Sequence, residues 1–160
     1  LGGVGAIEVG GPNGLSGYWN RPEKTAEEFR DDGFCMTGDL GTMEDDGYVT
    51  IVGRSKDLVI SGGYNIYPKE IESVLDDEPG VIESAVFGVP HPDFGEGLLA
   101  AVVLSDDKLE PETLLAAMGE KLARFKQPKA IFPMDALPRN TMGKVQKNVL
   151  RDAYGDHFSS

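Results

Sequence analysis

Cysteine is almost absent from this sequence of 160 residues, which contains only Cys35. A lone thiol cannot form an internal disulfide, so the fold must be held together by packing, and such cysteine usage fits a reducing cytoplasm. Cys35 lies between Phe34 and Met36, with no base nearby in the sequence. We therefore predict that Cys35 is a small buried hydrophobic residue and not a nucleophile.

Basic residues are also scarce, because 15 lysines and arginines stand against 27 aspartates and glutamates, giving a formal net charge of −12. Nucleic acids and anionic membranes both select a basic surface, so neither is expected as a partner. Long hydrophobic runs are missing too, since stretches such as residues 98–104 are far too short to span a bilayer. The first residues lack the pattern of a secretory signal. We predict a cytoplasmic protein without a membrane span.

The first part of the chain, residues 1–53, indicates a small β-rich piece. We expect a strand at residues 5–9, a short helix at 22–30 and a hairpin whose strands, 40–44 and 48–52, flank Asp45-Asp46-Gly47. So short a stretch buries little core, so it is not expected to be a complete domain.

The pattern changes after residue 57. An apolar strand is expected from Leu58 to Tyr64, running into a Gly62-Gly63 corner, and the remaining elements are helices at 68–77, 111–125 and 146–154 and strands at 85–89, 98–104 and 130–134. The nearly continuous apolar runs at 85–89 and 98–104 are typical of strands covered on both faces. The predicted fold class is α+β: a small C-terminal domain with a short sheet flanked by helices, preceded by the β-rich piece.

Several residues have side chains suited to binding or catalysis, each with a plainer alternative. The Asp39 carboxylate can accept hydrogen bonds from two ribose hydroxyls, or it can accept backbone N–H groups in a turn. The tripeptide Thr37-Gly38-Asp39 alone favours the turn. Arg54 can bind a phosphate or ribose oxygen, or pair with one of the many acids. Lys144, in a run of turn formers, would by itself be an ordinary surface lysine. Gly62 and Gly63 suit either a tight turn or the close approach of a ligand.

A metal site is not predicted. His91, Asp93 and Glu96 lie close together in the sequence, but Pro90 and Pro92 flank the single histidine. That arrangement favours a surface loop.

Three runs occur in an order that resembles one family. They are Cys35-Met36-Thr37-Gly38-Asp39, the joint from Gly53 to Glu72, and Pro138-Arg139-Asn140-Thr141-Met142-Gly143-Lys144. The chain is similar in these runs to the acyl-adenylate-forming enzymes, which include acyl-CoA synthetases, peptide-synthetase adenylation domains and luciferases. The family implies a two-step ligation, in which a carboxylate attacks ATP to give an acyl-adenylate and pyrophosphate, and the thiol of CoA then displaces AMP.

The resemblance implies a role for each candidate residue. Asp39 matches the residue that binds the ATP ribose, and Arg54 matches a nucleotide contact. Lys56 matches the pivot of a hinge at residues 54–57, about which residues 58–160 would rotate as a mobile C-terminal domain. Gly62 and Gly63 match the corner that lines the pantetheine tunnel for CoA. Lys144 matches the lysine that catalyses adenylate formation.

The resemblance also implies what would lie outside this sequence. Residues 1–53 would be the end of a large N-terminal nucleotide-binding domain, most of which would precede Leu1. The phosphate-binding loop, the acidic residue that holds Mg²⁺ and the acyl pocket would be there, so the 160-residue chain alone is expected to be inactive. Some relatives are regulated by acetylation of the matching lysine, which implies a lysine acetyltransferase acting on Lys144.

Within the family, the runs 56–70, 88–97 and 137–147 look most like malonyl-CoA synthetases. The sequence is thus interpreted as part of an ATP-dependent malonate–CoA ligase, with a medium- or long-chain fatty acyl-CoA synthetase as the near alternative. A non-catalytic binding module that reuses the fold is the alternative from another class. The small-molecule partners would be a carboxylate, ATP and CoA.

Overall fold

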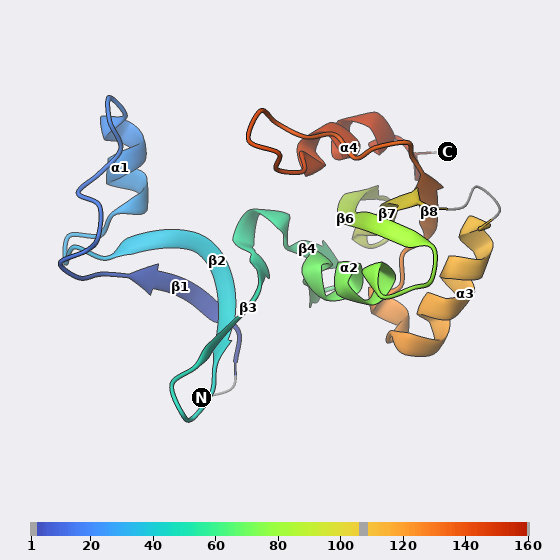
Figure 1. The fold of residues 1–160 in the computed structure, drawn as a ribbon, viewed down its shortest axis with the longest axis horizontal. Coiled ribbons are helices and arrows are strands. Elements are labelled where there is room, and N and C mark those ends of the chain that lie inside the picture. The colour runs from blue at the N-terminus through green and yellow to red at the C-terminus, as the bar shows by residue number, and fades with distance from the viewer. Residues whose placement is uncertain (1–2, 106–108, 160) are drawn as a thin grey trace. The chain divides into compact units, whose positions relative to one another are not determined.

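A computed structural model of the chain describes residues 3–105 and 109–159. The chain divides into two compact units, unit 1 (Leu1–Lys56) and unit 2 (Asp57–Ser160), and each is considered by itself (Figure 1).

Unit 1 contains a three-stranded antiparallel sheet with the order β1-β2-β3, formed by β1 (Gly5–Val9), β2 (Cys35–Met43) and β3 (Val49–Arg54). The predicted strand at 5–9 and the predicted hairpin are both present. Gly47 makes the hairpin turn possible, because its φ of +87° is readily adopted by glycine and its N–H donates to the Glu44 carbonyl oxygen at 3.0 Å.

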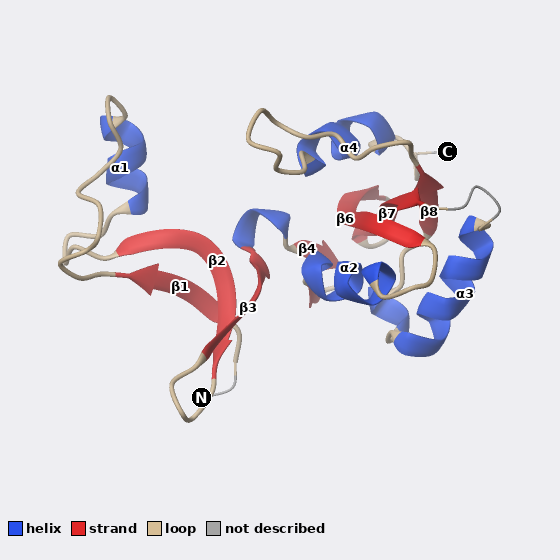
Figure 2. Ribbon diagram, viewed as in Figure 1, coloured by secondary structure: helices blue, strands red, loops and turns tan. Residues whose placement is uncertain are grey.

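The helix of unit 1, α1 (Pro22–Glu28), is shorter than the predicted 22–30. Proline stands at its first turn, where a missing N–H costs nothing. The helix ends because Phe29 has an extended backbone (φ −110°, ψ 132°), after which the Arg30 N–H donates to the Phe34 carbonyl oxygen at 2.8 Å. Figure 2 shows this short helix beside long loops.

Unit 1 has almost no hydrophobic core. Among its described residues, Cys35 is the one buried hydrophobic side chain, at 9% exposure, which confirms the prediction of a buried cysteine. Its large exposed hydrophobic residues are Val4, Val9, Leu15, Trp19, Phe34, Met36, Met43, Tyr48, Val49 and Ile51. A unit that leaves so much apolar surface in water gains little stability from burial.

The small core of unit 1 and the two buried clusters of unit 2 predict that the two units unfold differently when they are expressed separately. Residues 57–160 should unfold in one cooperative thermal transition, since they contain two buried clusters. Residues 1–56 should show no cooperative transition. Circular dichroism melts of both fragments test this expectation, and a cooperative, concentration-independent melt of residues 1–56 would contradict it.

Unit 2 contains a five-stranded sheet with the order β5-β4-β7-β6, in which β8 pairs with β7. The strands are β4 (Val59–Ser61), β5 (Tyr64–Ile66), β6 (Val81–His91), β7 (Gly95–Leu104) and β8 (Ala130–Pro133). All neighbours are antiparallel except β7 and β8. The strand predicted from Leu58 is present as β4 but ends at Ser61, and the predicted Gly62-Gly63 corner is present, whereas the second strand that begins at Tyr64 was not predicted. Gly62 and Gly63 have φ values of +57° and +83°, so the chain reverses there and two short strands pair as a hairpin.

Three helices cover this sheet: α2 (Pro68–Asp76), α3 (Pro111–Lys121) and α4 (Lys147–Tyr154). The predicted helix at 111–125 is too long, because Leu122 has an extended backbone and a 3-10 turn, η2 (Arg124–Lys126), follows. Phe125, the last residue of the predicted helix, lies in that turn; it is 39% exposed and its ring stacks on Tyr64 with centroids 4.5 Å apart.

The long strands β6 and β7 are covered on both faces, as their apolar runs predicted. One face of the sheet packs against α2 and α3 through a cluster that includes Val86, Ala100 and Val102. The other face packs against α4 through Phe87, Leu99 and Leu150, which are all at most 1% exposed. Figure 1 shows α4 on the opposite side of the sheet from α2 and α3. Helix α4 and the loop before it therefore rest on a rigid layer.

Candidate functional site

The two residues that are predicted to bind the nucleotide lie side by side in unit 1. Asp39 on β2 is paired in register with Arg54 at the end of β3, and Arg54 Nε lies 3.0 Å from Asp39 Oδ1. The Arg54 side chain is 49% exposed and that of Asp39 is 23% exposed. Because a carboxylate has two oxygens and a guanidinium has five N–H groups, the pair keeps free acceptors and donors for a ligand.

Thr37, Gly38 and Ser55 fix the backbone around Asp39. The Thr37 hydroxyl donates to the Ile7 carbonyl oxygen at 2.9 Å and accepts the Asp39 N–H at 3.1 Å. Gly38 has a φ of +74°, and its carbonyl oxygen accepts the Ser55 hydroxyl at 3.2 Å. These bonds tie the three strands together at the position of the carboxylate.

The predicted hinge residues fall at the boundary between the two compact units. Lys56 lies in a 3-10 turn, η1 (Ser55–Asp57), with its side chain exposed, and unit 2 begins at the next residue. Asp57 is held to unit 2, because Arg151 Nη2 on α4 lies 3.1 Å from its Oδ1. Arg151 is 94 residues away in the sequence, so sequence reasoning did not find this contact.

Gly62 and Gly63 form an exposed turn between β4 and β5. The Gly62 N–H donates to the Phe94 carbonyl oxygen at 2.9 Å, which anchors the turn on the neighbouring loop. A Cβ atom added to Gly63 would meet nothing within 4 Å. The backbone of the turn is therefore open to a close approach from outside.

Lys144 is exposed at the end of a closed loop that precedes α4. The Asn140 side-chain oxygen accepts hydrogen bonds from the N–H groups of Met142 and Lys144, each at 3.0 Å. In the part of unit 2 that the structure describes, no carboxylate pairs with the Lys144 ammonium group. Its backbone is thus fixed while its charge remains available.

A buried ion pair lies where α4 begins. Lys147 Nζ is 2.5 Å from Glu72 Oε1 on α2, and the same carboxylate oxygen accepts the Val86 N–H at 2.9 Å. The two side chains are 15% and 9% exposed. Removing one partner of such a pair leaves an uncompensated buried charge, so the contact fixes the start of α4 on α2 and β6.

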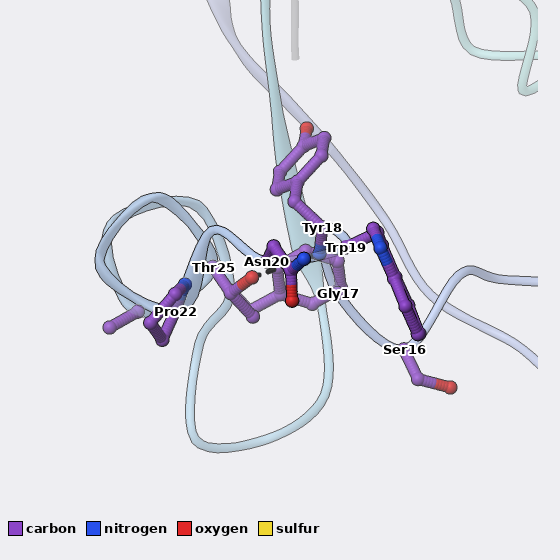
Figure 3. A pocket seen from close by; sticks show the side chains of 9 residues that line it. Ser16, Gly17, Tyr18, Trp19, Asn20, Pro22 and Thr25 are labelled. Carbon is purple, nitrogen blue, oxygen red and sulfur yellow. Dashed lines mark hydrogen bonds between the residues drawn. The ribbon is translucent and has the colours of Figure 1, made fainter.

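A further concavity in unit 1 was not predicted from the sequence. It has a volume of about 730 Å³ and is lined by Ser16, Gly17, Tyr18, Trp19, Asn20, Pro22, Thr25, Ala26 and Phe29 (Figure 3). The hydroxyl of Tyr18 donates to the Glu28 carboxylate, which lowers the pKa of Glu28 and raises that of Tyr18. Trp19 is 89% exposed.

His91 and Glu96 lie at the facing ends of β6 and β7, with Asp93 in the turn between them, so the predicted surface loop is a hairpin end. The Asp93 N–H donates to His91 Nδ1 at 3.1 Å, and Glu96 Oε2 accepts the Ile60 N–H at 2.8 Å. Within residues 3–105 and 109–159, no three His, Cys, Asp or Glu side chains are grouped so that they could hold a metal ion. In the same residues, every helix is too short or too polar to cross a bilayer.

Comparison with known proteins identifies the class. Residues 70–144 match the family described as the AMP-binding enzyme C-terminal domain. This part of the chain therefore belongs to that family, and the resemblance to acyl-adenylate-forming enzymes is confirmed.

Individual relatives are similar over nearly the whole chain. The ATP-bound crystal structure of MatB from Rhodopseudomonas palustris is 58% identical, with a TM-score of 0.89 over 98% of this chain and 31% of that one. A long-chain-fatty-acid–CoA ligase of Mycobacterium tuberculosis is 46% identical over 140 residues, which are 88% of this chain and 28% of the ligase. A feruloyl-CoA synthase of an Amycolatopsis species is also 46% identical, over 94% of this chain and 31% of the synthase. The chain thus spans about a third of the length of such relatives.

Proposed function

We propose that the chain is the C-terminal part of an ATP-dependent acyl-CoA ligase. The observation that carries this proposal is Lys144, exposed on a hydrogen-bonded loop at the end of the region that matches the AMP-binding family. An ammonium group there is suited to stabilise the charge that develops as a carboxylate attacks the α-phosphorus of ATP. The products of the complete reaction are acyl-CoA, AMP and pyrophosphate.

Unit 1 is interpreted as the end of a larger N-terminal domain. Its exposed hydrophobic residues, Trp19 among them, support this role because they would be covered by the rest of such a domain. The accessible Asp39–Arg54 pair would contact the nucleotide there. Mg²⁺ would be held by residues outside this chain, and we place the enzyme in the cytoplasm, where ATP and CoA are available.

A rotation about Lys56 would let one site serve both steps. The adenylation pose would present Lys144, and the thioester-forming pose would present Gly62 and Gly63 to the pantetheine of CoA. Two structures of a relative support such movement. Compared with this chain, ATP-bound MatB gives a TM-score of 0.89, whereas apo MatB gives 0.70. The two MatB structures must therefore differ from each other over this region. The exposure of Lys144 also supports a lysine acetyltransferase acting on it.

Malonate is the carboxylate that we propose. The 58% identity to MatB, a malonyl-CoA synthetase, supports it. A long-chain fatty acid is the second candidate, supported by the 46% identity to the mycobacterial ligase.

The test uses the full-length protein with ATP, Mg²⁺ and CoA, and measures both pyrophosphate release and acyl-CoA formation. Malonate should support both activities at least tenfold better, as kcat/KM, than hexadecanoate, a preference of about 1.4 kcal/mol. The reverse preference would replace malonate by the fatty acid. Absence of pyrophosphate release with malonate, hexadecanoate and ferulate would favour the non-catalytic binding module instead.

A further inference from the structure

We propose that Arg139 and Asn140 are positioning residues that fix the backbone of Lys144 on the core of unit 2. The inference rests on the proposed catalytic role of Lys144, and it adds two side chains with no assigned role in that chemistry. Both precede Lys144 in the loop between β8 and α4.

Asn140 holds both backbone polar groups of Lys144. Its side-chain oxygen accepts the Lys144 N–H at 3.0 Å, and its own N–H donates to the Lys144 carbonyl oxygen at 2.9 Å. The Gly143 N–H donates to the Asn140 carbonyl oxygen at 2.9 Å, and Gly143 has a φ of +78° that suits glycine. With the Met142 N–H, which also donates to the Asn140 side-chain oxygen, four hydrogen bonds to one residue close the loop between residues 140 and 144.

Arg139 connects this closed loop to the sheet. Its Nη1 donates to the Gly143 carbonyl oxygen at 2.7 Å, and its Nη2 bonds the Glu83 carboxylate on β6. Strand β6 is a rigid reference, because Ala85 and Phe87 on it are at most 1% exposed. A planar guanidinium can make both contacts at once, whereas the single ammonium of a lysine cannot form the same fork.

These contacts should affect the position of Lys144 more than the stability of the fold. The side chains of Arg139 and Glu83 are 43% and 30% exposed, and ion pairs in that setting contribute little to folding. In contrast, stabilisation of a developing charge depends strongly on the placement of the donor, and a small displacement lowers the rate steeply. A purely structural role would reduce both half-reactions and the melting temperature together.

The experiment measures each half-reaction in the full-length protein with Arg139→Ala and Asn140→Ala. Adenylate formation should fall roughly ten- to a hundredfold in kcat, with a smaller change in KM for ATP. Thioester formation from supplied acyl-adenylate, and the melting temperature, should remain near those of the unmodified protein. Asn140→Thr should recover part of the adenylation rate, since a threonine hydroxyl accepts such backbone N–H groups more weakly than the asparagine side chain does.

Three further variants make the result decisive. Lys121→Ala is the matched control, because the half-exposed Lys121 on α3 pairs with Glu78, whose side chain is 10% exposed, and neither residue belongs to the loop, so the change should alter neither step. Glu83→Gln should lower adenylation although Arg139 keeps its charge. Arg139→Lys should recover only part of the rate. If Glu83→Gln leaves the rate of adenylate formation unchanged and Arg139→Lys keeps the full rate of the unmodified protein, Arg139 acts through its charge alone. Its positioning role is then overturned.

Lys144→Ala in the same assays separates this inference from the proposed function. If Lys144→Ala leaves adenylate formation intact, the proposed function of Lys144 fails. If Lys144→Ala abolishes adenylate formation while Arg139→Ala and Asn140→Ala behave like Lys121→Ala, the positioning inference alone is overturned.

Discussion

Replacing Lys144 by alanine in the full-length enzyme is expected to lower the rate of adenylate formation by a factor of ~10²–10³, which corresponds to about 3–4 kcal/mol. The expectation follows from the loss of a preorganised positive charge that is exposed at the end of the loop before α4. Single-turnover measurement of adenylate and pyrophosphate is the appropriate assay, because it isolates chemistry from product release.

The second half-reaction is the internal control for Lys144→Ala. Thioester formation from supplied malonyl-adenylate should be nearly unchanged, since Gly62 and Gly63 would line the site in that pose. The melting temperature should also be nearly unchanged, because an exposed side chain outside the core contributes little to stability. Acetylation of Lys144 removes the same charge and should reproduce the defect. Equal losses in both half-reactions, or an unfolded variant, would refute the assignment.

Replacing Lys56 by proline is expected to reduce thioester formation far more than adenylate formation, by roughly a hundredfold. Proline fixes φ and removes a hydrogen-bond donor, so the backbone at the boundary between the units could no longer take two conformations. The enzyme would then reach the adenylation pose but not the thioester-forming pose. Rapid-quench measurement of each half-reaction distinguishes the two steps.

Lys56→Ala is the matched control for the hinge, because it removes the exposed side chain and keeps the backbone free to change its dihedral angles. It should leave both half-reactions near their original rates. A loss in Lys56→Ala as large as that in Lys56→Pro would show that the ammonium group matters and that the hinge explanation is wrong.

Elements with strong local signals could be predicted from the sequence. The apolar runs in β6 and β7 predicted strands covered on both faces, and Asp45-Asp46-Gly47 predicted a hairpin turn that is present. The Gly62-Gly63 corner was predicted, but strand β5 after it was missed because Tyr64-Asn65-Ile66 is too short to show an apolar pattern of its own. Helix α3 was extended too far because Phe125 continued the apolar spacing, although its ring stacks on Tyr64 outside the core.

The candidate site could be predicted only in part from the sequence. Asp39, Arg54 and Lys144 could be selected by motif, but the pairing of Asp39 with Arg54 depends on strand register, which includes a bulge after Leu40. The contact of Arg139 with Glu83 joins residues 56 positions apart. Such contacts arise from the tertiary fold and leave no local pattern in the sequence.

The ion pair between Asp57 and Arg151 has a mechanical consequence for any rotation at the joint. Because Asp57 is clamped to α4, the backbone torsions that can change without disturbing unit 2 are those that precede it. In the proposed rotation, all of unit 2 would then turn as one body about a single residue, Lys56. Such a rotation would carry Lys144 with it without deforming the loop that holds it, because that loop is hydrogen-bonded within unit 2.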